Sequence, residues 1–380
     1  MTDQEKVERL PAGLQTYGKM LLGKQLTEMP QQPEKGKWYR LYAEGTFCAF
    51  DEPYHACFKS GTENKLLIIF CGGGVSINAY TAAHPNSVFN PPGAVNFYTD
   101  DVFLAADLVP PHGLGADRAD NPFRNWFALF VPYATGDFHC GENDFSFRDD
   151  AGAEKVVHHR GYTNYRALIA KIQRYVPSPE QIVVTGFSAG AFATALLTDD
   201  VMDRFPDCRD VTCFPDSAQL LYRGWRETAE KVWKAPKAIS ERLTGDNITL
   251  DSLLALHRKR GDSVKIMYAC SCRDNMLSAY QHYIDFGEMT GATQEDGVTF
   301  SRRYAEMARV LRQQIPGIGL FICDLPAEGD DAEKHLTRHC INMSDEVYTC
   351  MVDGVRCIDW IEQCTRGEMM QLGLSLLNIE

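Results

Sequence analysis

The sequence predicts an α/β fold built on one mainly parallel, doubly wound sheet. Short apolar segments rich in β-branched residues recur along the 380-residue chain, and segments with helical spacing of apolar residues separate them. The segment 65–70 is a nearly continuous apolar run, which is typical of a strand buried on both faces of a parallel sheet. Alternation of strands and helices over the whole length favours a sheet covered by helices on both faces.

The individual elements follow from apolar periodicity and from the turn-forming residues that end each segment. The predicted strands are 38–50, 54–58, 65–70, 126–133, 181–185, 211–217, 264–270 and 319–323. The predicted helices are 162–175, 191–197, 300–314 and 358–364. The first two strands are expected to pair with each other through a turn at 51–53.

Changes of composition define the expected domain organisation. Residues 1–36 are a polar lead with one helical stretch, and residues 37–380 are expected to form a single domain. Within it, residues 76–121 are rich in Asn, Pro and Gly and predict a long irregular excursion beside the sheet. Residues 218–263 contain several helical patterns and are expected to form a cap.

Charge and composition argue against several classes of function. The 38 Lys and Arg residues are outnumbered by 51 Asp and Glu, the net charge is −13, and no basic run occurs. We therefore expect no nucleic-acid partner and no binding to an anionic membrane, and no apolar run is long enough to span a bilayer. Residues 1–6 lack the basic and apolar regions of a secretory signal, so a cytoplasmic location is expected. Nothing in the sequence indicates an oligomeric state.

The cysteines are expected to be free thiols. There are 13 of them, an odd number, and no secretory signal accompanies them. In a reducing compartment such residues are most simply small buried side chains.

A candidate nucleophile lies between a predicted strand and a predicted helix. The motif Gly186-Phe187-Ser188-Ala189-Gly190 follows the strand 181–185 and precedes the helix 191–197. In α/β-hydrolases, G-x-S-x-G in this context holds a serine on a tight, strained turn above the sheet. Ser188 is therefore the expected nucleophile, and the two glycines permit the close approach that such a turn requires.

A serine hydroxyl needs a base to accept its proton and an acid to orient that base. In α/β-hydrolases the acid and then the histidine follow the serine along the chain. Asp274, just past the strand 264–270, is the favoured acid, and Asp216, one strand earlier, is the alternative. Two candidates for the base, His335 and His339, follow the last predicted strand.

The two histidines also have the i, i+4 spacing of a metal site on a helix. However, no Glu stands between them as in H-E-x-x-H, and no third ligand is evident. We therefore expect no metal and no cofactor.

Backbone amides at two places are expected to stabilise the oxyanion of an acyl-transfer reaction. The run 72–74 consists of three glycines and follows the strand 65–70, where lipases and esterases supply one such amide. Ala189 directly follows the nucleophile and supplies another. Gly73, Gly74 and Ala189 are therefore the expected donors, because glycine lets bare backbone approach the substrate closely.

Two polar residues follow the strand 126–133. Asp137 and His139 are expected to lie at the same edge of the sheet as Ser188. Both are candidates for contact with the acyl or alcohol part of a substrate, and for Asp137 the capping of a turn is an equal alternative.

Together these segments resemble the pectin acetylesterase family, which includes plant pectin acetylesterases and Notum-type carboxylesterases. The resemblance extends from about Trp38 to Cys364. The segments that carry it are 70–74, 131–139, 158–161, 186–190, 216–217, 274–275, 339–341 and 348–360.

The resemblance implies an α/β-hydrolase fold and a metal-independent triad that removes acyl groups from hydroxyls. It implies Ser188 as nucleophile, Asp274 as acid and His339 as base, with the oxyanion held at 73–74 and 189. The stretch 330–338 looks longer than is usual in the family, so the choice between His339 and His335 stays open at this point.

The expected function is therefore that of a serine esterase. Its expected substrates are small-molecule or oligosaccharide esters, with acetyl or another short acyl group on a carbohydrate or small alcohol. The alternatives are a thioesterase or a lipid or protein deacylase, and a non-catalytic binding protein on a hydrolase scaffold. Dispersed aromatics in the excursion and a basic cap favour the short acyl group over a fatty chain. The aromatics are Phe89, Phe97, Tyr98 and Phe103, and the cap residues are Arg223, Arg226, Lys231, Lys234 and Lys237.

Overall fold

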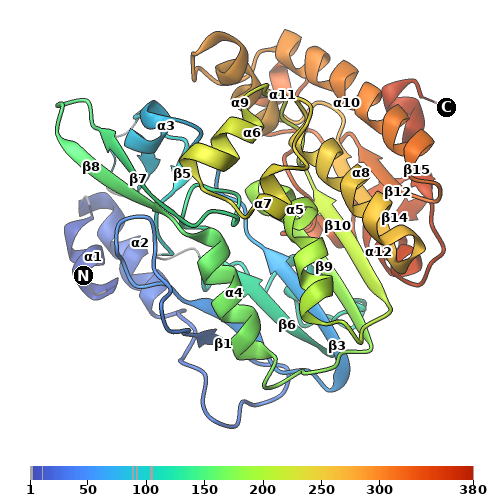
Figure 1. Cartoon of the computed structure of the whole chain (residues 1–380), viewed down its shortest axis with the longest axis horizontal. Coiled ribbons are helices and arrows are strands. Elements are labelled where there is room, and N and C mark those ends of the chain that lie inside the picture. Colours follow the sequence, from blue (N-terminus) through green and yellow to red (C-terminus); the bar gives the residue numbers. More distant parts are fainter. Residues whose placement is uncertain (1–2, 11, 88–89, 91–92, 103–105, 380) are drawn as a thin grey trace.

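A nine-stranded sheet forms the centre of the computed structural model, which describes residues 3–379 except 11, 88–89, 91–92 and 103–105 (Figure 1). The strands follow one another across the sheet in the order β1-β2-β6-β3-β9-β10-β11-β12-β15. Their bounds are β1 (Trp38–Leu41), β2 (Ala56–Lys59), β3 (Glu63–Phe70), β6 (Trp126–Val131), β9 (Gln181–Phe187), β10 (Val211–Asp216), β11 (Val264–Ser271), β12 (Gly319–Cys323) and β15 (Gln371–Leu372).

The sheet is parallel from β6 to β15, and β2 pairs antiparallel with both of its neighbours, β1 and β6. Strand β3 lies between β6 and β9, so the chain adds strands on one side of β3 and then on the other. In open α/β sheets, ligands bind at the carboxyl ends of the strands where the winding reverses in this way. The mostly parallel sheet with flanking helices confirms the predicted α/β-hydrolase-like fold class.

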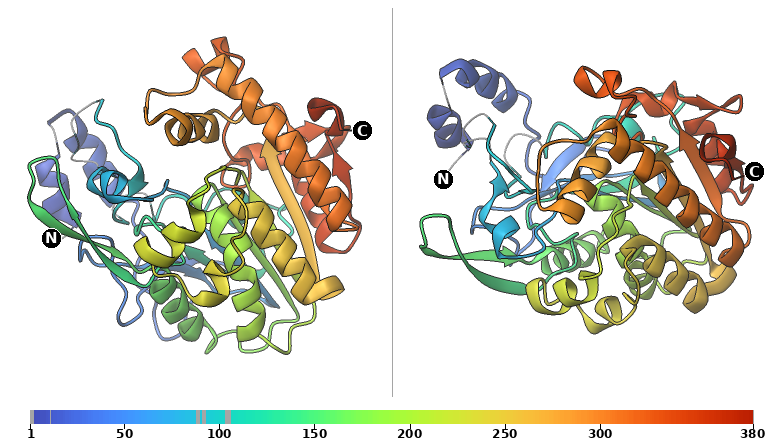
Figure 2. Two further views of the ribbon diagram at one scale, coloured as in Figure 1. Left: turned by 45° about the horizontal axis from the view of Figure 1, so that its top comes forward. Right: turned by 90° about the horizontal axis from the view of Figure 1, so that it is seen from above.

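Helices cover both faces of the sheet (Figures 1 and 2). Alternate residues of β3 enter two different cores, Leu66 and Ile68 on one side and Leu67 and Ile69 on the other. The first core contains residues of several helices, and the second contains residues of α12 (Cys357–Thr365). The helices of the first core include α4 (Gly161–Ile172), α5 (Ala189–Arg204), α8 (Ile248–Arg260) and α10 (Gln294–Gln314).

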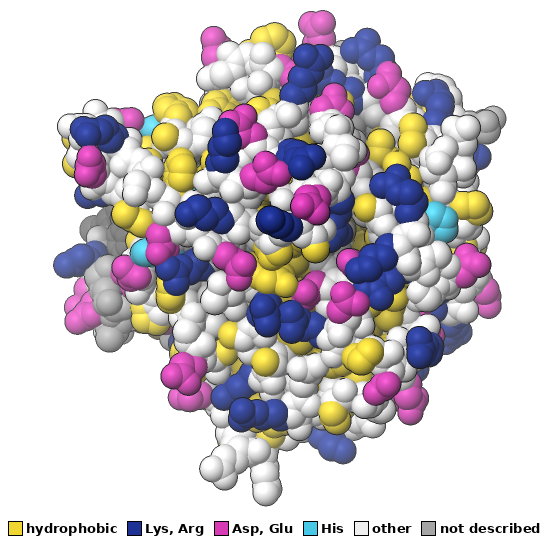
Figure 3. Space-filling model, in the orientation of Figure 1, with side chains coloured by type: hydrophobic (Ala, Val, Ile, Leu, Met, Phe, Trp, Pro, Cys, Tyr) yellow, Lys and Arg dark blue, Asp and Glu magenta, His cyan; other side chains and the backbone are white. Residues whose placement is uncertain are grey.

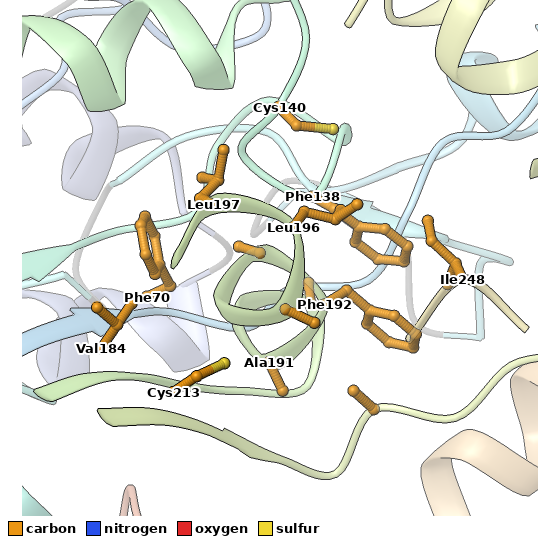
Figure 4. Packing of buried hydrophobic residues seen from close by; sticks show 14 of the residues in the cluster. Phe70, Phe138, Cys140, Val184, Ala191, Phe192, Leu196, Leu197, Cys213 and Ile248 are labelled. Carbon is orange, nitrogen blue, oxygen red and sulfur yellow. The ribbon is translucent and has the colours of Figure 1, made fainter. Parts of the chain in front are cut away.

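Helix α5, which begins directly after Ser188, is buried along most of its length. Figure 4 shows Phe70 of β3, Val184 of β9 and Cys213 of β10 on one side of this helix and Phe192, stacked on Phe138, on the other. This packing sets the position of the helix start relative to the strand ends.

The excursion between β3 and β6 is mostly irregular. It contacts the glycine run that follows β3 and the loop that follows His339, which both lie at the carboxyl ends of the strands. Thr99 donates its N–H to Gly73 O (2.7 Å), and Leu114 donates its N–H to Asn342 O (3.1 Å). Its regular elements are α3 (Ala79–Ala83), β4 (Pro85–Asn86), β5 (Tyr98–Thr99) and η1 (Gly113–Gly115). Phe89 and Phe103, two of the aromatics noted in the sequence, lie outside the described residues.

The segment predicted as a cap divides into two parts. Helix α8 packs against α5 and connects β10 to β11, so it belongs to the helical layer and not to a cap. The preceding part contains α6 (Trp225–Glu227), a π-helical turn (Thr228–Val232) and α7 (Lys237–Ser240).

Several elements have no counterpart among the predictions. They include an antiparallel hairpin, β7 (Asn143–Arg148) with β8 (Glu154–His159), which projects from the body of the molecule in Figure 1. The N-terminal lead forms two helices where one was predicted. The remaining elements are α1 (Asp3–Arg9), α2 (Ala12–Leu22), η3 (Gly261–Ser263), α9 (Asn275–Phe286), α11 (Asp330–Glu333), η4 (Asp345–Tyr348), β13 (Met351–Val352), β14 (Val355–Arg356) and η5 (Leu374–Leu377).

Acidic and basic side chains are interspersed over the face of the molecule shown in Figure 3. All 13 cysteines are unpaired in this structure, and 12 of them are buried. Among the described helices, none has both the length and the apolar character needed to cross a membrane.

Candidate active site

Ser188 lies on a strained turn between β9 and α5. Its backbone has φ 55° and ψ −126°, a conformation that non-glycine residues rarely adopt. A Cβ atom at Gly186 would overlap the carbonyl of Gly190, and one at Gly190 would overlap the carbonyl of Phe70. The motif therefore needs glycine at both positions because the end of β3 and the start of α5 meet at this turn.

The glycine run after β3 lies directly beside this turn. A Cβ atom at Gly72 would be 2.6 Å from the Cβ atom of Ser188. Among the described residues, none accepts a hydrogen bond from the N–H groups of Gly73, Gly74 or Ala189. The Ala189 amide is in the first turn of α5, where the helix dipole favours negative charge. These amides are thus available to a developing oxyanion beside Ser188.

His339 is paired with Asp274. The Nδ1 atom of His339 lies 2.9 Å from Oδ1 and 2.7 Å from Oδ2 of this aspartate. A carboxylate only accepts hydrogen bonds, so Nδ1 carries the proton and Nε2 of neutral His339 keeps its lone pair. Asp274 is fully buried, and it also accepts the N–H of Leu277 (2.9 Å) as the N-cap of α9.

The electrostatics around His339 favour the protonated imidazole. Burial on its own lowers the pKa of His339, but the charge of Asp274, its hydrogen bond and the more distant Asp216 outweigh that effect. The net result is a pKa raised above the usual value of 6.5. A base of this kind is strengthened for proton abstraction from a serine.

Thr337 attaches the loop that carries His339 to the neighbourhood of Asp274. We call residues 337–342 the histidine segment. Its N–H donates to Arg273 O (2.9 Å), and its carbonyl accepts the N–H of Asn275 (3.0 Å). Its hydroxyl donates to Ser271 Oγ (2.9 Å) and accepts the N–H of Arg273 (2.9 Å). The residues on both sides of Asp274 are therefore joined to a residue two positions before His339. Sequence reasoning missed Thr337, because a threonine in a loop carries no signal of this role.

Asp216, the alternative acid, binds the backbone of the histidine segment and not the imidazole. Its Oδ2 accepts the N–H groups of Ile341 (2.7 Å) and Asn342 (2.8 Å), and its carbonyl accepts the N–H of Ser188 (3.1 Å). The neighbouring Ser217 accepts the N–H of Cys340 at its Oγ (3.2 Å). The serine turn and the histidine segment are thus both attached to residues 216–217, which places them side by side.

His335, the alternative base, is exposed and no described hydrogen bond joins its ring to an acid. Helix α11 ends at Glu333, so His335 and His339 do not share a helix face. The i, i+4 spacing that suggested a metal site therefore has no helix beneath it.

Asp137 takes the turn-capping role. It is fully buried, and its Oδ1 accepts Thr135 Oγ1 (2.6 Å) and the N–H of His139 (3.1 Å). Its Oδ2 accepts the N–H groups of Gly141 (3.1 Å) and Gly161 (2.7 Å). With both oxygens satisfied inside the protein, Asp137 has no oxygen left to offer a substrate.

His139 is also buried, and it supports the glycine run. Burial lowers its pKa to about 4, so the ring is neutral at pH 7. Its Nε2 lies 3.0 Å from Cys71 O and must donate to it, because a carbonyl only accepts. His139 therefore anchors the residue before Gly72 instead of lying on the surface where a substrate would bind.

Comparison with known proteins supports the expected resemblance for the part of the chain that carries the glycine run and Ser188. Residues 54–223 match the model of the pectinacetylesterase family, which confirms that resemblance over this range. The chain is also similar to pectin acetylesterase 5 of Arabidopsis thaliana, with 23% identity over 181 residues. That match covers 47% of this chain and 40% of the relative, so less than two thirds of the relative's length is represented. The family match includes Ser188 and the glycine run but ends before Asp274 and His339.

Proposed function

We propose that this chain, whose residues 54–223 match the pectinacetylesterase family, is a serine esterase that hydrolyses O-acyl esters. One observation carries the proposal. The His339–Asp274 pair lies beside the strained Ser188 turn because both are attached to residues 216–217. A nucleophile, a base and an orienting acid are the three groups that acyl transfer from an ester requires.

In the proposed reaction Ser188 Oγ attacks the ester carbonyl and His339 Nε2 accepts its proton. Asp274 holds the imidazole in the required tautomer and stabilises the imidazolium that forms. The amides of Gly73, Gly74 and Ala189 stabilise the oxyanion. The imidazolium then gives its proton to the leaving alcohol, which leaves the acyl group bonded to Ser188 Oγ. Water attacks the acyl carbon while His339 Nε2 accepts its proton, and the imidazolium returns a proton to Ser188 Oγ as the carboxylic acid leaves.

The proposed substrates carry acetyl or another short acyl group on a carbohydrate or small alcohol. The basic cap residues do not support this choice, because Arg226 and Lys231 pair with Glu230 and Glu227 on their own segment. The arrangement of Gly73, Gly74 and Ser188 fits any acyl ester equally well, so a thioesterase or a lipid or protein deacylase is the second candidate. A cytoplasmic location stays part of the proposal.

A panel of substrates tests the proposal directly. Acetylated sugars, acyl-thioesters and p-nitrophenyl esters of rising chain length are compared at one enzyme concentration. We expect kcat/KM to peak between acetyl and butyryl and oxygen esters to be preferred. Ser188→Ala should lower kcat by about 10⁴-fold or more without unfolding the protein.

A fluorophosphonate probe provides the control. It should label the wild type at Ser188 and leave Ser188→Ala unlabelled. Labelling that survives this substitution would disprove the assignment of the nucleophile, and a preference that rises towards octanoyl would favour the lipid deacylase.

A further inference from the structure

Three tyrosines from distant parts of the sequence form a cluster beside the glycine run. Tyr80 lies on α3, Tyr222 lies between β10 and α6, and Tyr283 lies on α9. The ring centroids of Tyr80 and Tyr283 are 6.4 Å apart, with their planes 18° from parallel. Tyr222 directly follows Leu221, whose backbone is hydrogen-bonded to Gln281 of α9, the helix that carries Tyr283. We call Tyr80, Tyr222 and Tyr283 the tyrosine cluster.

The cluster is held in place by contacts behind it. Phe97, which is buried, packs against Tyr283 with a centroid distance of 4.5 Å and against Tyr80 at 5.7 Å. The backbone next to Tyr222 is joined to α9, since Leu221 N–H donates to Gln281 Oε1 (2.7 Å) and Gln281 Nε2 donates to Leu221 O (3.0 Å). Figure 1 shows α3, α6 and α9 at the same end of the molecule.

The cluster adjoins the reacting groups through two contacts of the glycine run. Gly72 meets Ser188, and Gly74 meets the carbonyl of Phe97 and the hydroxyl of Tyr280 so closely that no Cβ atom would fit. Two residues of extended chain span at most about 7 Å, so these two contacts are close together. Helix α9, which carries Tyr280 and Tyr283, begins directly after Asp274.

The cluster presents both apolar and polar groups to solvent. Tyr80 is 49% exposed, and Tyr222 and Tyr283 are half-buried. Within the part of the chain that the structure describes, the hydroxyls of Tyr80 and Tyr222 have no hydrogen-bond partner. A buried fatty chain would leave these hydroxyls unpaired, which is unfavourable. A sugar ring has an apolar face of C–H groups and a rim of hydroxyls, and tyrosine offers a matching aromatic face and polar tip.

We propose that the tyrosine cluster is a carbohydrate subsite that binds a sugar ring of the alcohol part of the substrate. The ring packs on Tyr80 and Tyr283, and its hydroxyls bond to the tyrosine hydroxyls. The inference rests on the proposed esterase function for its catalytic readout, but the binding it describes is separate from catalysis.

The first test compares Tyr80→Ala with the wild type on two kinds of acetyl ester. The probes are acetylated oligosaccharides of xylose and of galacturonic acid, and glyceryl triacetate, which has no sugar ring. We expect Tyr80→Ala to raise KM for the oligosaccharides about three- to tenfold with little change in kcat, the pattern of a lost binding contact. The increase for glyceryl triacetate should be smaller by at least about threefold. Tyr80→Phe, which keeps the ring, should recover most of the loss.

Tyr42→Ala is the matched control, because Tyr42 is 39% exposed and packs on His55 beside the strand β1. Tyr42→Ala should leave KM and kcat unchanged for the oligosaccharides and for glyceryl triacetate. Equal losses on the oligosaccharides and on glyceryl triacetate in Tyr80→Ala would overturn the subsite. So would a loss that is larger for long-chain acyl esters, which would make the cluster an acyl pocket.

The second test separates this inference from the proposed function. Deacetylated oligosaccharides are titrated calorimetrically into Ser188→Ala and into Ser188→Ala with Tyr80→Ala. Binding that weakens about three- to tenfold in the double variant supports the subsite even if the wild type cleaves no ester. Equal binding by the two proteins, or no binding by either, overturns it even if the esterase is active.

Discussion

Asp216 and Asp274 both lie at the carboxyl ends of neighbouring parallel strands, yet they bind different parts of the histidine segment. Both are fully buried; Asp216 is the last residue of β10, and Asp274 lies in the loop that follows Ser271, the last residue of β11. Asp274 binds the imidazole of His339, whereas Asp216 binds the backbone amides of residues 341 and 342. The first is positioned to support proton transfer, and the second is positioned to hold the loop that carries the base.

The comparison teaches that a strand-end position does not by itself determine the role of an acid. The two acids differ in the group of the histidine segment that each of them binds. Thr337 attaches this segment beside Asp274, and the turn that follows His339 places two N–H groups on Asp216. Replacing an aspartate by asparagine removes its negative charge but keeps an oxygen that accepts hydrogen bonds. This substitution should therefore affect Asp274, which needs its charge, more than Asp216, which acts as a hydrogen-bond acceptor.

The largest expected effect comes from removing the base itself. His339→Ala should lower kcat by about 10⁴-fold or more, because triad members act as a unit. His335→Ala should cost less than about tenfold, since its ring is exposed and binds no acid in the described structure. Steady-state kinetics of both variants make the measurement. A larger loss in His335→Ala than in His339→Ala would show that His335 serves as the base. Asp274 would then no longer be the acid that orients the base.

Asp274→Asn should have the next largest effect, lowering kcat by about 10³- to 10⁴-fold, because an amide cannot stabilise the imidazolium and favours the wrong tautomer. Asparagine is also a good N-cap, so α9 should keep its start and the thermal midpoint should change little. Calorimetry of the variant is the control. A variant that is unfolded, or one that keeps near-normal kcat, would contradict the assigned role.

Asp216 should respond in a graded way. Asp216→Ala removes the acceptor for two loop amides, and displacement of His339 should lower kcat about 10- to 100-fold. Asp216→Asn should lower kcat less than about tenfold, because its amide oxygen still accepts both N–H groups and its amide NH2 can donate to Ser217 Oγ. Equal losses in Asp216→Asn and Asp274→Asn would remove the distinction between the two acids.

The smallest expected effect is a change in the pH profile. His339 must be neutral to accept a proton, so kcat/KM should rise with pH and level off above the raised pKa of this histidine. The inflection for the wild type should lie above 6.5. Asp216→Asn should move it down slightly, because the charge of Asp216 is the smallest of the contributions that raise this pKa. A wild-type inflection below 6.5 would contradict the electrostatic account.

Much of the fold and of the nucleophile region was predictable because their signals are local. The strands β3, β9, β10, β11 and β12 coincide closely with apolar runs in the sequence. The hairpin of β7 and β8 was not predicted, since four of the six residues in each strand are polar and the strands lie outside the main sheet. The tyrosine cluster was not predicted either, because its members come from three separate segments.

The sequence by itself determined the Ser188 turn, since its two glycines, the strand before it and the helix after it are adjacent along the chain. It also narrowed the acid and the base to two candidates each. Only the tertiary structure decided which acid binds which part of the histidine segment, because Asp216 and Ile341 are 125 positions apart. Hydrogen bonds between such distant residues depend on the ordered packing of the whole sheet edge, and no local spacing of residues encodes them.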